Sequence, residues 1–299
     1  MHQTKGILYV LTTAIISGVS IYVNGLAVKF ANPYVFTGIK NLLVGLAFLS
    51  LILLVKEWKS IKALKRKDWL RLILIGLIGG SIPFLLFFQG LSLTMAVKGS
   101  FIHKTMFIYV SFLAIIFLKE KLNKSLLLGL GALLVGNVLF LQIKPQALQM
   151  GDLLILIATL FWAIEIIIAK KALKNLSPKI VAWGRIFFGA MFIFTFLMVT
   201  GQAGQIFSYS LIQWQWILIT SVFLFAYVFT FYHGLKYVRA SVATAILALG
   251  APITGLITLI AQEGISWNIS QIWGVGLMLV GVVLVVGISN LLPKKELAV

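Results

Sequence analysis

The chain has 299 residues, of which 61% are hydrophobic and only 11% are charged. A soluble domain has about a quarter charged residues, so this chain lacks the polar side chains to cover a globule of its size. It has no cysteine, which excludes disulfides, iron–sulfur clusters and thiolate metal sites. In a soluble protein, the net charge of +18 would suggest a nucleic-acid partner, but membrane topology explains it better.

The hydrophobic residues form runs of about twenty, the length that crosses a bilayer as a helix. Ten such runs are predicted, near residues 6–28, 34–55, 70–91, 96–118, 125–143, 151–170, 178–200, 213–233, 240–261 and 270–289. The first run is long enough to span, and no cleavage site for a signal peptide follows it. The strict alternation that is typical of barrel strands is not seen. The chain is therefore predicted to be an all-α polytopic membrane protein with ten transmembrane helices.

Lysine and arginine predict the orientation, because they collect in cytoplasmic loops. If the N-terminus is cytoplasmic, nineteen basic residues lie in inner segments and only Lys29, Lys98 and Lys144 lie in outer ones. Both termini are therefore expected in the cytoplasm, in a protein of the plasma membrane with no nucleic-acid partner. The densest cluster, KEWKSIKALKRKDWLR (56–71), is interpreted as a basic inner loop. The alternative is an amphipathic helix that lies on anionic lipid.

The chain repeats itself. LGLGALLVGNVLFL (128–141) and WGVGLMLVGVVLVV (273–286) share three glycines in the same frame, 145 positions apart, and Lys40 matches Arg185 at the same offset. FFQGLSL (87–93) likewise matches FYHGLKY (231–237) at an offset of 144. We therefore predict two five-helix repeats in one membrane domain, residues 1–144 and 145–299. Since five is odd, the second repeat enters from the opposite face, and such inverted repeats are typical of secondary transporters.

Glycines in the last span of each repeat are predicted to pack helices together, because small residues let helix backbones approach closely in lipid. They are Gly129, Gly131, Gly136, Gly274, Gly276 and Gly281.

With this ordered pair of repeats, the chain resembles the drug/metabolite transporter superfamily, in particular proteins with two EamA-type domains. The resemblance is seen in ASVATA (240–245), LGAPITGLITLIAQE (249–263), the acid-ended FLAIIFLKEKL (112–122) and the glycine-rich helices that follow. It implies ten helices around a central cavity, with the fifth and tenth at the periphery. It also implies export or exchange of small metabolites, often amino acids, without ATP. One departure is Tyr109, which stands where the second half has Pro252 and where the family usually has proline in both halves.

Ionisable residues inside membrane spans are costly and are candidates for function. The residues predicted to bind substrate are Asn24, Lys40, His103, Lys104, Trp162, Glu165 and Arg185. Glu165 and Arg185 lie at similar depth on neighbouring spans and are expected to pair, either structurally or as a pair that substrate or a proton breaks. Trp162 precedes Glu165 by three residues and shares its helix face, where plain helix packing is the alternative.

The remaining candidates are less well partnered. Lys104 has no acid in the spans of its own half, so it is expected to reach Glu165 or to be held neutral by burial. Otherwise the cavity holds an excess of cations, which favours a substrate with an anionic group. The alternative for Lys40 is that it snorkels to outer headgroups. His103 is a candidate carrier of a coupling proton, and Pro83 and Pro252 are predicted hinges.

We therefore expect an alternating-access secondary transporter, not an enzyme, that exports small metabolites such as amino acids or related carboxylate-bearing compounds. A nucleotide-sugar or phosphate-ester carrier of the same fold is the alternative. A membrane-embedded enzyme or a channel is less favoured, since no paired acids or nucleophile–base pattern is seen. No cofactor or metal is expected, because three histidines and seven acids show no ligand spacing.

Overall fold

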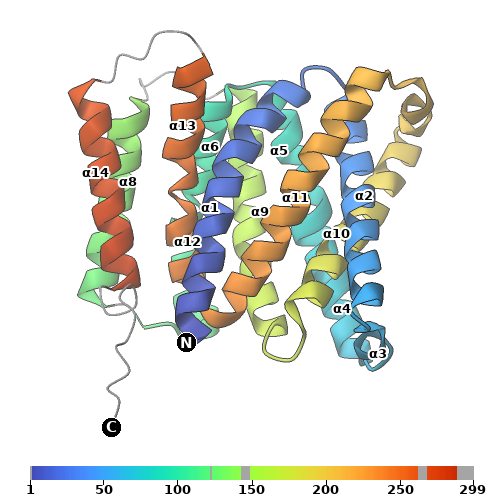
Figure 1. The fold of residues 1–299 in the computed structure, drawn as a ribbon, viewed down its shortest axis with the longest axis horizontal. Coiled ribbons are helices and arrows are strands. Elements are labelled where there is room, and N and C mark those ends of the chain that lie inside the picture. The colour runs from blue at the N-terminus through green and yellow to red at the C-terminus, as the bar shows by residue number, and fades with distance from the viewer. Residues whose placement is uncertain (1, 122, 143–148, 262–267, 288–299) are drawn as a thin grey trace.

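The computed structural model describes residues 2–121, 123–142, 149–261 and 268–287, whose regular elements are all helical (Figure 1). The first repeat holds α1 (His2–Ala27), α2 (Pro33–Leu54), α3 (Trp58–Lys62), α4 (Arg66–Ile75), the π-helix η1 (Gly76–Ser81), α5 (Ile82–Ser92), α6 (Ala96–Lys104), α7 (Met106–Leu118) and α8 (Lys124–Leu141). The second holds α9 (Met150–Ala172), α10 (Pro178–Val199), the 3-10 helix η2 (Ala203–Ser208), α11 (Leu211–Tyr237), α12 (Ala240–Leu247), α13 (Gly250–Ala261) and α14 (Ile269–Val286).

Within the described residues, nine helical spans are long and apolar enough to cross a membrane, and some of them consist of two or three consecutive helices. The shorter apolar helix α8 supplies the tenth crossing, so the predicted all-α polytopic fold is confirmed. The third span consists of α4, η1 and α5, and it begins four residues before the predicted boundary, at Arg66. The basic cluster 56–71 folds partly into α3 and the first turns of α4, so it is more helical than the predicted loop.

Two spans are interrupted at equivalent places. The fourth span breaks at Thr105, between α6 and α7, and the ninth breaks at Ala248 and Leu249, between α12 and α13. Thr105 and Ala248 are 143 positions apart, the same separation as the corresponding residues Tyr109 and Pro252. The first break has no proline beside it, and Pro252 lies in the first turn of α13 rather than at the second break. Proline does not explain the first break. At the second break, the carbonyl of Ala248 is four residues before Pro252, which has no N–H to donate to it, so proline contributes to that interruption. Pro83 is the second residue of α5, directly after the π-helix.

The two repeats have opposite directions in the bundle. In Figure 1, α1 begins at the lower end and rises, whereas its counterpart α9 begins at the upper end and descends. α14 also ends at the lower end, where α1 begins. The odd number of spans per repeat predicts this inversion, because each crossing reverses the direction of the chain.

The glycine contacts between helices show the same relation. A Cβ on Gly129 would lie 2.7 Å from the carbonyl oxygen of Gly281, and a Cβ on Gly136 would lie 2.7 Å from that of Gly274. Gly129 is the repeat counterpart of Gly274, and Gly136 is that of Gly281. Each contact is therefore the image of the other, which is the reciprocal pattern that a two-fold axis produces. Since α8 and α14 are antiparallel, that axis lies across the bundle, in the plane of the membrane.

The same symmetry relates the pairs of helices in the interior. A Cβ added to Gly6 of α1 would lie 3.3 Å from the carbonyl oxygen of Gly234 of α11. A Cβ added to Gly151 of α9 would lie 2.8 Å from the carbonyl oxygen of Gly90 of α5. The second contact is the repeat image of the first. The first helix of each half thus packs on a helix of the other half, so the halves are interleaved rather than set side by side.

Two of the six glycine predictions are wrong. An added Cβ on Gly131 or Gly276 would meet nothing within 4 Å, and both residues are exposed on the outer face of their helices. Each lies two residues from a packing glycine, and positions two apart do not share a helix face.

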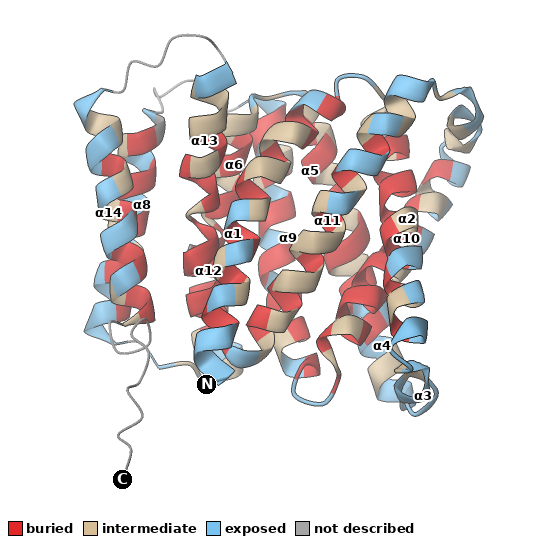
Figure 2. Cartoon of the chain, in the orientation of Figure 1, coloured by how far each residue is buried: buried red, intermediate tan, exposed pale blue. Residues whose placement is uncertain are grey.

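Burial follows the layout of the bundle (Figure 2). The buried residues concentrate in α9, α10, α12 and the inner faces of α1 and α5. α8 and α14 stand together at one edge, with exposed side chains such as Leu128, Val135 and Leu279 on their outer faces. A wide band of exposed apolar side chains is stable only against lipid, which agrees with a polytopic membrane protein.

Candidate functional site

A cavity of about 70 Å³ lies at the centre of the bundle, lined by α1, α5, α6, α7, α9, α10 and α11. Five of the seven predicted site residues line it: Asn24, His103, Trp162, Glu165 and Arg185. Lys40 and Lys104 are buried behind this lining rather than in it. The structure therefore brings most of the predicted site together and places two of its cations in a second layer.

The cavity lies on the pseudo-two-fold axis. Its lining contains counterparts from both repeats, which are the pairs Ser17 and Trp162, Ser20 and Glu165, Ile21 and Ile166, and Phe87 and Phe231. Equivalent positions can surround one space only if the axis that relates them passes through it. The shape of the cavity is thus nearly symmetric, but its chemistry is not, because a tryptophan and a glutamate on one side face two serines on the other.

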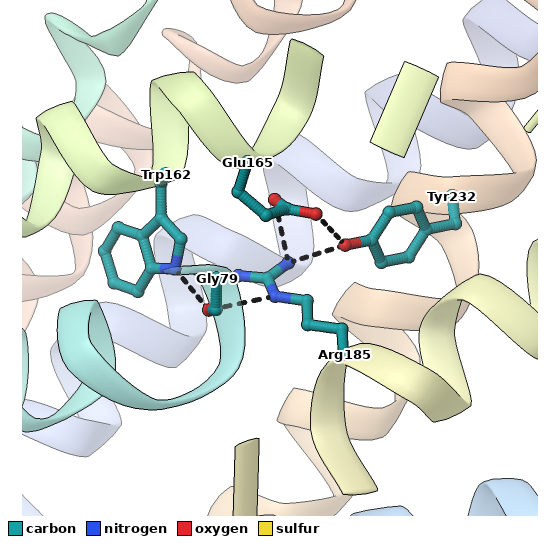
Figure 3. Close-up of polar contacts among 5 residues, drawn as sticks. All are labelled: Gly79, Trp162, Glu165, Arg185 and Tyr232. Carbon is teal, nitrogen blue, oxygen red and sulfur yellow. Dashed lines mark hydrogen bonds and ion pairs between the residues drawn. The ribbon is translucent and has the colours of Figure 1, made fainter. Parts of the chain in front are cut away.

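Glu165 belongs to a three-residue network (Figure 3). The hydroxyl of Tyr232 on α11 donates a hydrogen bond of 2.5 Å to Oε1 of Glu165 on α9. Nη1 of Arg185 on α10 lies 3.5 Å from the Tyr232 oxygen and 4.0 Å from Oε2 of Glu165. The predicted Glu165–Arg185 pair thus exists, but it is long, and Tyr232 holds both partners.

The carbonyl of Gly79 orients two other groups of the site (Figure 3). It accepts hydrogen bonds from Nε1 of Trp162 at 2.8 Å and from Nε of Arg185 at 3.1 Å. Gly79 lies in the π-helix η1, and such wide turns alter the regular ladder of backbone hydrogen bonds, often at functional sites. A Cβ on Gly79 would lie 2.2 Å from Cγ of Glu165. Only glycine therefore lets this carbonyl come so close to the charged pair.

Lys40 does not snorkel to the membrane surface, so that interpretation is wrong. Its side chain is 1% exposed, and Nζ donates a hydrogen bond of 2.8 Å to Oδ1 of Asn24. Nζ also lies 3.6 Å from the centre of the Phe88 ring, a cation–π contact. Lys40 and Phe88 are the repeat counterparts of Arg185 and Tyr232, so each half places a cation against an aromatic ring of its third span.

Lys104 does not reach Glu165, which corrects the expected pairing. Its Nζ donates a hydrogen bond of 2.6 Å to Oγ of Ser17 on α1, and Arg185 is the cation that the described residues place within 4.0 Å of Glu165. A Cβ on Gly250 would lie 2.7 Å from Cε of Lys104, so a glycine makes room for this side chain beside the break in the ninth span. Lys104 of the fourth span thus contacts both α1 and the start of α13 in the ninth span.

His103 adjoins Lys104 but faces the cavity. Its ring stacks edge-on against Trp162 at 4.9 Å and lies 5.4 Å from Phe87, between ring centres. Its Nδ1 is buried and has no hydrogen-bond partner within the described residues. The same part of the chain contains no cluster of three or more histidine, aspartate or glutamate side chains that could hold a metal ion.

The sequence interpretation missed Tyr232, Ser17 and Gly79. Tyr232 lies in FYHGLKY, the segment that defines the repeat, and it could have been found as the one hydroxyl that replaces Phe88 of the first half. Ser17 is the counterpart of Trp162 and could have been found by the same offset. Gly79 had no comparable signal, because its role depends on a π-helical turn.

The comparisons with known proteins agree with this geometry. The EamA-like transporter family matches the chain twice, over residues 4–142 and 149–287. The chain belongs to the EamA-like transporter family. It is therefore a multi-pass membrane transporter and not an enzyme, as predicted.

Individual relatives are distant. The chain is 24% identical over 255 residues to the "Uncharacterized transporter YyaM" of Bacillus subtilis (strain 168), which covers 83% of both proteins. It is 23% identical over 250 residues to the "Uncharacterized transporter YetK" of the same organism, covering 80% of this chain and 74% of the relative. One solved crystal structure has a TM-score of 0.72 over 92% of this chain and 94% of its own, at 14% identity. At that identity the likeness concerns the fold alone.

Proposed function

We propose that this transporter works by alternating access and exports small zwitterionic metabolites, amino acids or related carboxylate-bearing compounds, across the plasma membrane. The observation that supports this is a central cavity on the two-fold axis that holds one loosely bound carboxylate–guanidinium pair. Because the two repeats have the same fold in opposite orientations, they can pack against each other in two nearly equivalent ways. Exchange between these two arrangements opens the central cavity first to one side of the membrane and then to the other.

The network around Glu165 suits a substrate with both charges. Oε2 of Glu165 is buried and accepts no hydrogen bond within the described residues, and Glu165 is one of the residues that line the cavity. The nearest Arg185 nitrogen is 4.0 Å away, which is too far for a hydrogen bond. An ammonium group would satisfy Oε2, and a carboxylate would take the guanidinium of Arg185, which prefers planar anions. The substrate would thereby replace the internal pair by two closer ones.

The charge balance of the interior supports an anionic group on the substrate. Lys40, Lys104 and Arg185 are buried within the spans near the cavity, and of the described residues only Glu165 places a carboxylate in the cavity lining. A further negative charge would reduce this excess, since uncompensated charges in a low-dielectric interior are costly. The same excess is what favours the second candidate, a carrier of phosphate esters such as nucleotide sugars.

The cavity size indicates that substrate entry requires movement. About 70 Å³ is well below the about 300–1,000 Å³ of typical small-molecule sites, so we expect the halves to separate before an amino acid binds. We further propose that the lower end of Figure 1 faces the cytoplasm, because the basic segments around residues 56–71, 119–124 and 170–179 lie there. His103 is the proposed carrier of a coupling proton, because it lines the cavity and its Nδ1 has no hydrogen-bond partner in the described part of the chain.

Counterflow into liposomes tests the proposal. Purified protein is reconstituted, vesicles are loaded with single amino acids, organic acids or sugar phosphates, and uptake of the labelled compound is followed with and without a pH gradient. Glu165→Gln should lower counterflow at least about tenfold, because it removes a charge-assisted contact. Glu57→Gln is the matched control, since Glu57 pairs with Lys179 outside the cavity.

Three outcomes would contradict parts of the proposal. Wild-type counterflow by both Glu165→Gln and Arg185→Gln would show that the site is misplaced. Competition by phosphorylated compounds but not by amino acids would select the phosphate-ester carrier. Conductance without saturable counterflow would indicate a channel.

A further inference from the structure

A second cavity, of about 830 Å³, is lined in part by residues of α3 and α4, two helices that lie at the lower end of the bundle in Figure 1. Its polar lining comes from three separate segments: the α3–α4 region, the loop from α9 to α10, and the end of α11. These polar residues are Ser60, Lys65, Lys67, Asp68, Arg71, Asn175, Ser177 and Lys236. None of them lines the central cavity, so this is a distinct site that the proposed transport does not use.

The lining has an excess of positive charge. Four cations, Lys65, Lys67, Arg71 and Lys236, face the single carboxylate of Asp68. Asp68 is already occupied, because Oδ2 accepts a hydrogen bond from the backbone nitrogen of Lys65 at 3.2 Å and Oδ1 lies 3.6 Å from Nη1 of Arg71. Within the described residues, the ammonium groups of Lys65, Lys67 and Lys236 have no carboxylate within 4.0 Å. These three lysines therefore have no anionic partner among the described residues, and an added anion could bind to them.

The site lies where a lipid headgroup would lie. Arg66 begins the third span, Pro178 begins the seventh and Tyr237 ends the eighth, so the cavity is at the level of the membrane surface. Lys67 shares a face of α4 with Leu70 and Leu74, which are 58% and 41% exposed and lie one and two turns further into the span. One stripe of α4 thus has a cation at the surface and bare leucines along the hydrocarbon layer.

Orientation of the chain does not by itself explain this arrangement. The charge bias that sets topology requires only that basic residues lie on one side of the membrane. It does not require that residues from three segments converge around one space, with two lysines from the first repeat opposite one from the second. Phospholipid chemistry fits both halves of the site, because a phosphate attracts the cations and an acyl chain covers the leucines.

We infer that this cavity binds the phosphate of an anionic phospholipid, with its acyl chains along Leu70 and Leu74. The bound headgroup connects the α3–α4 region of the first repeat with Asn175 and Lys236 of the second. It therefore stabilises the folded protein by linking segments that belong to different halves.

Thermal unfolding of the full chain in detergent tests this inference. Phosphatidylglycerol, phosphatidylcholine or inorganic phosphate is added to the wild type, to a cavity variant (Lys65→Gln, Lys67→Gln and Lys236→Gln together) and to a control variant (Lys5→Gln, Lys59→Gln and Lys124→Gln together). The control removes the same charge from exposed positions at the same end, outside the cavity. Each single substitution in the cavity is measured too, so that the test remains informative if the triple variant does not fold.

Phosphatidylglycerol should raise the melting temperature of the wild type and the control by about 3 °C or more at saturation. The cavity variant should lose most of that increment, and each single variant should lose part of it. Phosphatidylcholine and inorganic phosphate should have little effect. If inorganic phosphate raised the melting temperature equally, the ligand would be a soluble phosphate compound rather than a lipid, and the inference would be wrong. Equal increments in the cavity and control variants would show that the lipid binds elsewhere and would overturn the site.

Discussion

The hydroxyl of Tyr232 lies 2.5 Å from Oε1 of Glu165 and donates the hydrogen bond that holds the carboxylate on one side of the central cavity. The corresponding positions of the first repeat are Phe88 and Ser20, which cannot form such a bond. The two halves therefore share a backbone plan but differ in chemistry where they meet the cavity. A nearly symmetric frame suits the exchange of conformations, and an asymmetric lining suits recognition of one substrate.

Tyr232→Phe tests this relationship. The change removes one donor from Glu165 and one contact from Arg185 while it keeps the ring. A hydrogen bond to a charged group contributes about 1.5–3 kcal/mol, so we expect substrate affinity in counterflow to fall about tenfold or more. Tyr209→Phe is the control, because its hydroxyl bonds to the carbonyl of Asn32 away from the cavity. If the two variants had equal substrate affinity, Tyr232 would not contribute to the binding site.

Gly79→Ala tests the π-helical turn. The added methyl group would lie 2.2 Å from Cγ of Glu165, so the carboxylate or η1 must move. We expect counterflow to fall at least about tenfold, with a melting temperature lowered by several degrees, because overpacking costs about 1–3 kcal/mol. Gly131→Ala should leave counterflow unchanged, since an added Cβ there meets nothing within 4 Å. Normal transport by Gly79→Ala would show that the close approach is dispensable.

Gly136→Ala tests the packing of α8 on α14. Its Cβ would lie 2.6 Å from Cγ of Met278 and 2.7 Å from the carbonyl oxygen of Gly274. We expect thermal unfolding to shift down by several degrees. Gly276→Ala, on the exposed face of α14, should instead be neutral or stabilise by about 0.5–1 kcal/mol, because alanine favours the helix. If both changes had the same effect, the assignment of the two helix faces would be wrong.

A double-mutant cycle tests the contact between Lys104 and Ser17. Nζ and Oγ are 2.6 Å apart and buried, so the effects of Lys104→Met and Ser17→Ala on unfolding should not add. We expect a coupling energy of about 1 kcal/mol. Lys104→Met combined with Thr195→Ala, on the exposed side of α10, should be additive within about 0.5 kcal/mol. Additivity in the first cycle would mean that the hydrogen bond contributes nothing.

Single cysteines test the proposed orientation, and the absence of natural cysteine makes the assay clean. Lys174 lies in the loop from α9 to α10, which is at the lower end of Figure 1. Ser208 ends η2, between α10 and α11 at the upper end, and both residues are exposed. A membrane-impermeant maleimide should label Ser208→Cys in intact cells and Lys174→Cys only after permeabilisation. The reverse pattern would show that the protein has the opposite orientation in the membrane. Labelling of both from one side would contradict the ten-span topology.

Much of the architecture can be read from the chain, because hydropathy and repeat spacing are local properties. Runs of about twenty apolar residues give the spans, and the offset of 145 residues together with an odd number of spans gives the inversion. The pairing of Glu165 with Arg185 was also accessible, because depth along a helix follows from residue count. Residue count does not give the rotation of a helix against its neighbours, and for that reason Gly131, Gly276 and the partner of Lys104 were wrongly predicted.

The details of the site depend on how distant segments meet. Whether Lys40 faces lipid or Asn24 is decided by the rotation of α2 against α1, and which group meets the Gly79 carbonyl is decided by a turn of η1 that departs from α-helical spacing. The basic cavity likewise requires three segments to converge, although its cluster of charges is plain in residues 56–71. Hydrophobicity acts on each segment separately, whereas hydrogen bonds form only between groups that packing has brought within about 3 Å of each other.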